Sequence, residues 1–302
     1  MSFALHLERP HNRGLVPRAC FTGAAGGAAC GDLVRISLTL DRERIATAAF
    51  DASGCGAAIA AGSAAAALVE GRPLLEAARV GAGEIARELG GLSPGKQHAA
   101  ELAADALHRA LGHAAREARL APAPGRRLVA LSGGVDSAVA ALLSGSRAVA
   151  VTLELWSDPE NDGERSCCSP QAVRAARGLA HALGLPHLSI DLREEFRAGV
   201  VDPFIAGYAA GETPNPCVGC NGHVRLDAML KLADRLGCAT LATGHYARTA
   251  ESDDARGPLL RAAADGAKDQ TYMLAALKPE SLARMHFPLG ELRKPEVREI
   301  AA

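Results

Sequence analysis

Aromatic residues are scarce in this sequence. They make up 3% of its 302 residues, so alanine, leucine and valine must supply most of the core. A strong charge of either sign is also missing, because 33 basic and 34 acidic residues leave a formal net charge of −1. No overall basic field therefore indicates nucleic acid, although a local patch would suffice. Apolar residues make up 48%, which is enough for a packed core, and the length favours about two domains.

The sequence also lacks the features of a secreted or membrane protein. Its N-terminus has no basic region followed by an apolar run, which a signal peptide would need. The longest apolar stretch, Ala57 to Val69, is alanine-rich and too short to span a bilayer. We therefore expect a cytoplasmic protein with no membrane partner. Its eight cysteines should then be thiols, or ligands for metal or sulfur, rather than disulfides.

Two regions with different secondary-structure rhythms are predicted. Residues 1–115 begin with a Gly/Ala-rich loop at 23–31 and continue with strands and then helices, which favours a small α+β domain. Residues 116–126 are rich in Pro, Ala and Gly and indicate a linker. Over 127–302 strands and helices alternate, which predicts an α/β domain with a doubly wound parallel sheet. Residues 296–302 look like the start of a helix without a stop signal, so we expect this domain to be C-terminally incomplete.

The periodicity of apolar residues places the elements. The predicted strands cover 33–40, 45–52, 128–131, 148–155, 187–191 and 239–243, and the predicted helices cover 57–70, 74–80, 98–111, 138–143, 170–183 and 224–236.

A glycine-rich turn joins the first strand and the first helix of the second region. It has the sequence Ser132-Gly133-Gly134-Val135-Asp136-Ser137. Two glycines let the backbone come close to a phosphate, and the free N–H groups at the helix start favour an anion. The two serine hydroxyls can add donors, whereas the Asp136 carboxylate suits Mg²⁺. No Gly-Lys-Ser/Thr follows, so the turn is not a Walker A loop.

This turn resembles the PP-loop of the ATP pyrophosphatases. Those enzymes cleave ATP between the α- and β-phosphates and adenylate a substrate oxygen. The alternative interpretation is an ordinary glycine turn in an α/β sheet. The loop alone leaves the acceptor open, because amidation, lysine ligation and thiolation all use it.

A second loop presents two thiols. Its sequence is Thr213-Pro214-Asn215-Pro216-Cys217-Val218-Gly219-Cys220-Asn221. The prolines restrict the backbone on either side of Asn215. Two cysteines at this spacing can hold a metal, relay a disulfide or expose one nucleophile.

Taken together, the motifs of the second region resemble those of the tRNA-specific 2-thiouridylase family. The chain has, in the order of that family, the PP-loop, Cys167-Cys168, the thiol loop, Gly244-His245-Tyr246-Ala247-Arg248 and Lys268-Asp269-Gln270-Thr271-Tyr272. The resemblance covers about Arg127 to Ala302. It implies ATP-dependent 2-thiolation of the wobble uridine of tRNA. ATP adenylates O2 of the unstacked base, sulfur attacks C2, and AMP departs.

The resemblance also implies roles for individual residues. Cys220 would be the nucleophile, and Asp136 would take part in catalysis with Mg²⁺. The residues that would bind ATP are Ala130, Leu131, Ser132, Gly133, Gly134, Val135, Asp136, Ser137, Leu153 and Gly244. Those that would bind tRNA are Asn215, Pro216, Cys217, Lys268, Asp269 and Gln270.

The sequence departs from the thiouridylase pattern in two places. Cys217 stands where the family has an aspartate. The second catalytic cysteine, which carries the persulfide, and the C-terminal barrel would lie beyond Ala302, so we expect this chain to be incomplete for catalysis. Cys217 and Cys220, with a third ligand, are candidates for an iron–sulfur cluster that delivers sulfide. The alternative is a benign change beside an ordinary nucleophile. We expect Cys167 and Cys168 to be structural and Cys238 to lie in the core.

The first region resembles the iron–sulfur scaffold family of the IscU/NifU N-terminal type. The motifs are Ala29-Cys30-Gly31-Asp32, Ser53-Gly54-Cys55-Gly56 and Gly95-Lys96-Gln97-His98-Ala99, with Ala99 at the place of the family's third cysteine. We predict that Cys30, Asp32, Cys55 and His98 form a site for iron, zinc or a cluster. Alternatively the module has lost its cluster and serves in docking or sulfur relay, or the cysteines are coincidental.

The implied partners are tRNA and a sulfur donor such as a cysteine desulfurase. A fused donor module would raise the effective concentration of sulfur to the order of mM. Two other functions stay open from the sequence. One is PP-loop thiolation of another acceptor. The other is an iron–sulfur scaffold or sulfur carrier whose PP-loop domain is degenerate and only binds.

Overall fold

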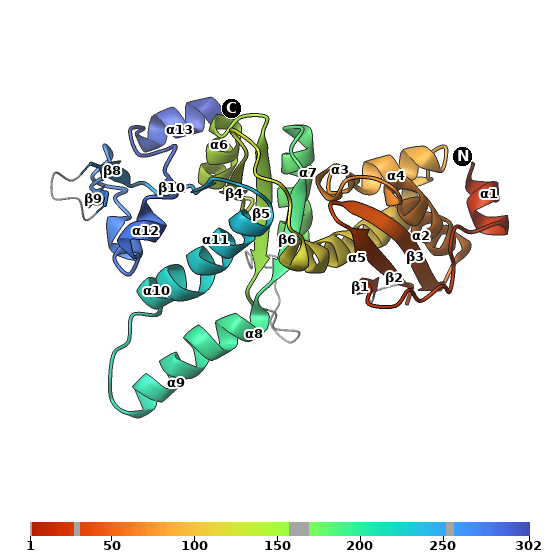
Figure 1. Cartoon of the computed structure of the whole chain (residues 1–302), viewed down its shortest axis with the longest axis horizontal. Coiled ribbons are helices and arrows are strands. Elements are labelled where there is room, and N and C mark those ends of the chain that lie inside the picture. The colour runs from red at the N-terminus through yellow and green to blue at the C-terminus, as the bar shows by residue number, and fades with distance from the viewer. Residues whose placement is uncertain (1, 27–30, 157–168, 252–256) are drawn as a thin grey trace. The chain divides into compact units, whose positions relative to one another are not determined.

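The structure is a computed structural model that describes residues 2–26, 31–156, 169–251 and 257–302 (Figure 1). By contacts the chain forms two compact units. One comprises Met1–Leu120 with Gly184–Ile190, and the other comprises Ala121–Leu183 with Asp191–Ala302. Among the described residues, no helix combines the length and the apolar character needed to cross a membrane.

The first unit contains a three-stranded antiparallel sheet of order β1-β2-β3. Its strands are β1 (Phe21–Gly26), β2 (Leu33–Asp41) and β3 (Arg44–Ser53). The loop predicted at 23–31 is therefore wrong over Gly23–Gly26, which belong to β1. The reason is close packing: a Cβ at Gly23 would lie 2.2 Å from the carbonyl oxygen of Ala106. Glycine here lets a helix approach a strand rather than make a turn.

Five α-helices belong to the first unit among the residues described. They are α1 (Phe3–Glu8), α2 (Gly56–Val69), α3 (Leu74–Ala77), α4 (Ala82–Glu88) and α5 (Gln97–Glu117), with a 3₁₀ turn at Pro94–Lys96. Helices α2 and α5 pack against the sheet and against each other. Alanines make up most of the buried residues of α2, so the scarcity of aromatics is met by close helix packing. The helix predicted at 74–80 ends earlier, at Ala77.

The second large sheet has five strands in the order β10-β7-β4-β5-β6. Their bounds are β4 (Arg127–Ala130), β5 (Ala148–Glu154), β6 (His187–Asp191), β7 (Thr240–Ala242) and β10 (Met285–His286). The pairs β4–β5, β4–β7 and β7–β10 are parallel, which confirms the predicted doubly wound α/β class. After β4 the chain adds β5 and β6 on one side of it, and then β7 and β10 on the other side. The strand order therefore reverses at β4. Ligands bind in this fold outside the carboxyl ends of strands at such a reversal.

The helices of the second unit are mostly short. They are α6 (Val135–Leu143), α7 (Pro170–Ala182), α8 (Arg193–Phe196), α9 (Asp202–Ala209), α10 (Pro216–Gly219), α11 (Leu226–Arg235), α12 (Pro279–Leu282) and α13 (Lys294–Ala301). A small antiparallel pair is formed by β8 (Arg248–Ala250) and β9 (Leu259–Arg261). Helix α13 confirms that the last residues are helical, and it packs on α6 through Val139, Ala140 and Val297.

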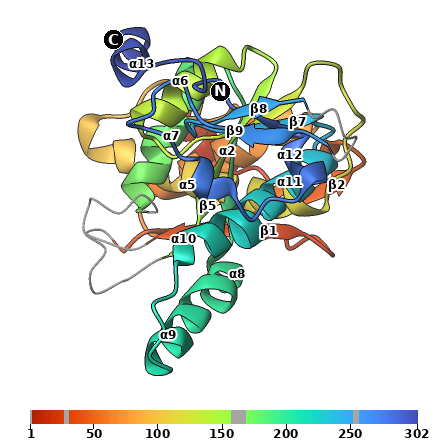
Figure 2. The same cartoon turned by 90° about the vertical axis from the view of Figure 1, so that its left-hand side faces the viewer.

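Two helical runs lie side by side in this unit, as both overall views show (Figures 1 and 2). The first joins α8 to α9 through a π-helical turn at Arg197–Val201, and the second joins α10 to α11 through a π-helical turn at Cys220–Arg225. Extra-wide turns of this kind are rare and are often found at functional sites. One of the two predicted thiols therefore begins such a turn.

Candidate active site and candidate metal site

The PP-loop connects β4 to α6 and is held closed by its own serines. The backbone N–H of Ser132 donates to Oγ of Ser137 at 3.1 Å, and that hydroxyl donates to the carbonyl of Gly134 at 2.8 Å. Gly133 has φ +80°, a conformation that favours glycine. Gly134 is the N-cap of α6, so the helix start and its unpaired N–H groups follow directly. The sequence thus builds the tight turn and helix start that its glycines predict, and phosphate binding there stays a prediction.

A cavity of about 240 Å³ opens beside this loop at the carboxyl ends of β4, β5 and β7. Seven of the predicted ATP residues line it: Ala130, Leu131, Ser132, Asp136, Ser137, Leu153 and Gly244. Gly133, Gly134 and Val135 belong to the loop but not to this lining, and Val135 is exposed. The sequence reasoning missed other residues of the wall, among them Asn221, Arg225, Thr243 and His245. We call this space the nucleotide cavity.

Asp136 carries two contacts that the sequence did not predict. The Tyr246 hydroxyl donates to Oδ1 of Asp136 at 2.9 Å, and Nζ of Lys294 lies 2.5 Å from the same oxygen. The Lys294 ammonium also lies 6.0 Å from the centroid of the Tyr246 ring. Burial, with the hydrogen bond to Asp136, raises the pKa of Tyr246, so its phenol stays protonated and donates. Lys294 follows Asp136 by 158 residues and belongs to no motif that could have revealed it.

The segment after β7 lies directly against the PP-loop. A Cβ at Gly244 would meet backbone atoms of Asp136 and Ser137 at 3.0 Å, so this glycine permits the close approach. The next residue, His245, shares a hydrogen bond of 2.9 Å between its Nδ1 and the Thr243 hydroxyl. Burial, assisted by the charge of Arg225, lowers the pKa of His245 to about 4. This imidazole is therefore neutral at neutral pH.

The thiol loop leads into the second helical run. Oδ1 of Asn215 accepts from the backbone N–H of Cys217 at 3.1 Å and thereby caps α10. Cys217 is exposed, whereas Cys220 is partly buried at the start of the π-helical turn. Burial raises the pKa of the Cys220 thiol, the charge of Arg225 opposes this, and Cys217 adds to the rise. At neutral pH Cys220 is therefore a thiol and needs a base to become a nucleophile.

A mostly apolar groove of about 370 Å³ runs between the two helical runs beside these cysteines. It is lined by Phe196, Val200, Val201, Phe204, Pro216, Cys217, Cys220, Asn221, Arg225 and Met273. We call it the thiol groove. Asn221 and Arg225 line both this groove and the nucleotide cavity. The predicted nucleophile and the predicted ATP site are thus neighbours across a wall that these two residues share.

The three residues predicted to contact tRNA near 268–270 are placed differently from one another. Lys268 is exposed. Burial works to raise the pKa of Asp269, but hydrogen bonds from Thr271 and from the backbone of Ala263 lower it overall. Gln270 lines the nucleotide cavity and accepts from the backbone N–H of Tyr246 at 3.1 Å. Asp269 and Gln270 therefore hold the chain around the cavity in place.

The remaining cysteine predictions have different outcomes. Cys238 is buried, and burial raises the pKa of its thiol to about 12, which agrees with a core position. Cys167 and Cys168 lie outside the described residues. Within the described ranges, no third His, Cys, Asp or Glu converges on Cys217 and Cys220. A cluster at these two cysteines therefore stays a prediction, without a third ligand from that part of the chain.

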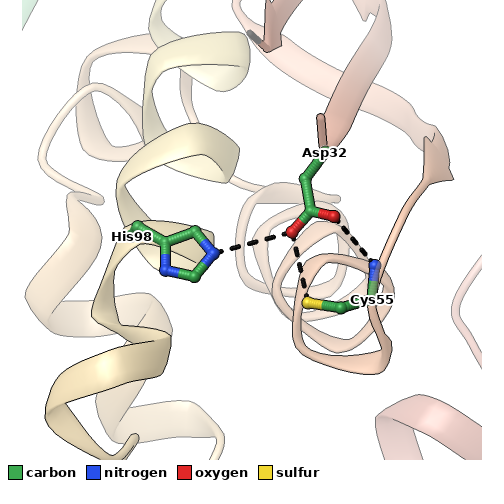
Figure 3. Close-up of side chains that lie close together, drawn as sticks. All are labelled: Asp32, Cys55 and His98. Atoms are coloured by element: carbon green, nitrogen blue, oxygen red, sulfur yellow. Dashed lines mark hydrogen bonds and ion pairs between the residues drawn. The ribbon is translucent and has the colours of Figure 1, made fainter. Parts of the chain in front are cut away.

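In the first unit, three of the four predicted metal ligands meet (Figure 3). Asp32 precedes β2, Cys55 is the residue just before α2, and His98 lies in the first turn of α5. One ligand atom from each falls within 4.8 Å of the other two. Sγ of Cys55 donates to Oδ2 of Asp32 at 3.2 Å, and Nε2 of His98 lies 3.6 Å from that oxygen. Cys30, the fourth predicted ligand, lies outside the described residues.

This cluster has the donor set of a site for zinc or iron. A thiol, an imidazole and a carboxylate are the usual ligands of those metals, and Nε2 of His98 is buried without a hydrogen-bond partner. Gly54 has φ +135°, and a Cβ there would lie 2.0 Å from Oδ1 of Asp32, so only glycine leaves room for the carboxylate. Ala99, at the place of the family's third cysteine, is fully buried and offers no ligand. The three residues fit a metal that takes its fourth ligand from elsewhere.

Comparison with known sequences agrees with this geometry. The sequence profile of the tRNA methyl transferase HUP domain family matches residues 126–302, which is more than half of the chain. The chain belongs to this family. The profile of the NifU-like N terminal domain matches residues 3–119, so a NifU-like region precedes the HUP domain. Both resemblances inferred from the motifs are thereby confirmed.

Two relatives match different shares of this HUP-domain chain. The bifunctional protein NifU/MnmA of Rubrobacter xylanophilus is 50% identical over 98% of this chain and 62% of its own length. The tRNA-specific 2-thiouridylase MnmA of Salinibacter ruber is 46% identical over 59% of this chain and 48% of its own length. This chain therefore spans between about half and two thirds of the length of these relatives.

Proposed function

We propose that this protein is an ATP-dependent tRNA-uridine 2-sulfurtransferase that thiolates the wobble uridine. The observation that carries this proposal is the shared wall between the nucleotide cavity and the thiol groove. An enzyme that activates a base with ATP and then delivers sulfur to it needs these two sites side by side. The names of the relatives, a NifU/MnmA protein and a 2-thiouridylase, support the same conclusion.

In the first step the nucleotide cavity would hold ATP, with the PP-loop and the start of α6 around its phosphates. O2 of the uridine attacks the α-phosphorus, the bond to the β-phosphate breaks, and pyrophosphate leaves. Asp136 is the residue that would hold Mg²⁺, which neutralises phosphate charge when bound. The donor chemistry fits, because Asp136 is a carboxylate in the cavity wall. Lys294 and Tyr246 fix its orientation through Oδ1.

In the second step sulfur replaces the adenylated oxygen. A sulfur nucleophile, either a persulfide on a second cysteine or sulfide, attacks C2, and the C2–O bond breaks with its electron pair leaving on AMP. With a persulfide, the Cys220 thiol would then attack the S–S bond, which leaves the sulfur on C2 and a disulfide between Cys220 and the second cysteine. The raised pKa of Cys220 favours the thiol form between turnovers. The apolar groove would exclude water from the activated base and so limit its hydrolysis.

Recognition of tRNA would involve the exposed residues around the groove. Asn215, Pro216 and Cys217 lie at its edge or beside it, and Lys268 offers an exposed charge for a phosphate. The neutral balance of the whole chain leaves such local contacts to carry the affinity.

The NifU-like unit would supply sulfur. Its Asp32, Cys55 and His98 would hold zinc, iron or a cluster, with Cys30 as the fourth ligand. A cysteine desulfurase is the class of partner that would load it. Fusion of donor and acceptor in one chain gives an effective concentration on the order of mM without any new contact.

The test is ATP–pyrophosphate exchange in the full-length protein, with Cys220→Ala to keep sulfur transfer from following adenylation. Exchange that depends on tRNA supports the proposal. Exchange that needs another acceptor points to a different thiolation, and no exchange with any acceptor points to a scaffold or carrier with a binding-only PP-loop domain.

A further inference from the structure

Arg225 stands where the two sites meet. It is the last residue of the π-helical turn that begins with Cys220, and it lines both the nucleotide cavity and the thiol groove. Its companion in the shared wall, Asn221, is buried and carries no charge. Arg225 is therefore the permanent positive charge of this wall.

The guanidinium of Arg225 has a buried N–H group that no hydrogen bond satisfies. Its Nη1 donates to Oδ1 of Asn221 at 3.3 Å, a long bond that holds the side chain in place. Its Nε is buried and has no hydrogen-bond partner. In the described ranges of the chain, no carboxylate pairs with it. A buried donor without a partner is costly in a protein, which indicates that a ligand completes it.

The charge of Arg225 acts on both sides of the wall. On the cavity side it helps burial to lower the pKa of His245, so the histidine beside it contributes no positive charge at neutral pH. On the groove side it opposes the rise of the Cys220 pKa. Both effects show that an anion placed at the wall would meet a favourable potential.

The reaction proposed above requires an anion at this place. When the adenosine lies in the nucleotide cavity and the acceptor base lies in the thiol groove, the α-phosphate joins the two. It must therefore lie at the wall that both spaces share. A guanidinium suits this group, because its planar donors match phosphate oxygens in pairs.

We propose that Arg225 is the binding site for the α-phosphate of the nucleotide and of the adenylated base. This proposal rests on the ATP-dependent adenylation proposed above. The Nε and terminal N–H groups would donate to non-bridging oxygens of the α-phosphate, and Asn221 would keep the fork aimed at them. The same contact would stabilise AMP as its charge increases on departure.

The test compares AMP with adenosine by isothermal titration calorimetry on the full chain. The variants are Arg225→Gln, Arg225→Lys and Lys231→Gln, the last being an exposed cation on the same helical run outside both linings. We expect Arg225→Gln to weaken AMP binding about tenfold or more while adenosine binding stays within about twofold. Arg225→Lys should recover part of the loss, and Lys231→Gln should behave like the wild type.

Two results would overturn the assignment. Equal losses for AMP and adenosine would make Arg225 a structural residue, and no loss for either would leave it without a ligand. Adenosine binding also reports that each variant is folded. Because neither ligand requires tRNA, the AMP–adenosine contrast can hold even if exchange proves independent of tRNA, and the two proposals fail separately.

Discussion

Gly244→Ala tests whether the segment after β7 sets the position of the PP-loop. A Cβ at this position would lie 3.0 Å from the carbonyl carbon of Asp136 and from the backbone nitrogen of Ser137. Ordinary contact begins near 3.4 Å, so the two segments must separate by about 0.4 Å. Both obstacles are main chain at the start of α6, and neither can rotate away. Overpacking of this kind costs about 1–3 kcal/mol of folding free energy.

The same displacement should weaken nucleotide binding, because it moves the helix start that faces the phosphates. We expect Gly244→Ala to lower the free energy of unfolding, measured by chemical denaturation, and to lower ATP affinity in calorimetry. A variant that unfolds and binds ATP like the wild type would refute the reasoning.

Two glycines of the same unit provide matched controls. A Cβ at Gly134 would meet only the Ser132 hydroxyl, at 3.7 Å, so Gly134→Ala should keep stability and lose ATP affinity by crowding the phosphate. A Cβ at Gly178 in α7 would have no atom within 4 Å, so Gly178→Ala should stabilise the helix by about 0.5–1 kcal/mol and leave ATP binding unchanged.

Three further predictions follow from the other contacts. The folded pKa of His245 is about 4 against 6.5 for the free group, so as the pH falls the unfolded chain takes up the proton first. Stability should decrease between pH 6.5 and about 4 and decrease less in His245→Gln, whereas equal slopes in denaturation curves would contradict this. Lys294→Met removes the ammonium that lies 2.5 Å from Oδ1 of Asp136 and would compete with a metal for this carboxylate. Mn²⁺, measured without ATP by electron paramagnetic resonance, should therefore bind severalfold more tightly to the variant. Unchanged Mn²⁺ affinity would exclude competition between Lys294 and the metal. Cys55→Ser should lower the zinc or iron content of the full chain while Cys20→Ser, elsewhere in the unit, keeps it, and equal metal in both would remove Cys55 from the ligand set.

The sequence predicted the α/β class and the turn between β4 and α6. Alternating strands and helices indicated the parallel sheet, and the motif Ser132–Ser137 marked the turn that lines the cavity. Local patterns suffice for these features, because a strand, a turn and a helix start are each encoded within a few residues. The strand at Phe21–Gly26 was missed since its glycines serve packing against a helix, which no local pattern reveals.

The contacts that complete the site depend on tertiary structure. Lys294 contacts Asp136, which lies 158 residues earlier in the sequence. Arg225 becomes significant only because the nucleotide cavity and the thiol groove are both lined by its side chain. Tyr246 and His245 belong to the motif at 244–248, yet their hydrogen bonds and burial could not be read from it. In the NifU-like unit the ligand set was predicted by resemblance, and the structure brings Asp32, Cys55 and His98 together as that resemblance implies.

The central claim is that the PP-loop cavity activates a tRNA uridine for sulfur transfer. The most direct measurement is mass spectrometry of nucleosides from tRNA incubated with the full-length protein, ATP, Mg²⁺ and a sulfide or persulfide source. The account predicts 2-thiouridine at the wobble position and one AMP formed for each sulfur gained. With Cys220→Ala it predicts no 2-thiouridine when a persulfide is the source. Unchanged uridine together with tRNA-independent AMP formation would contradict it.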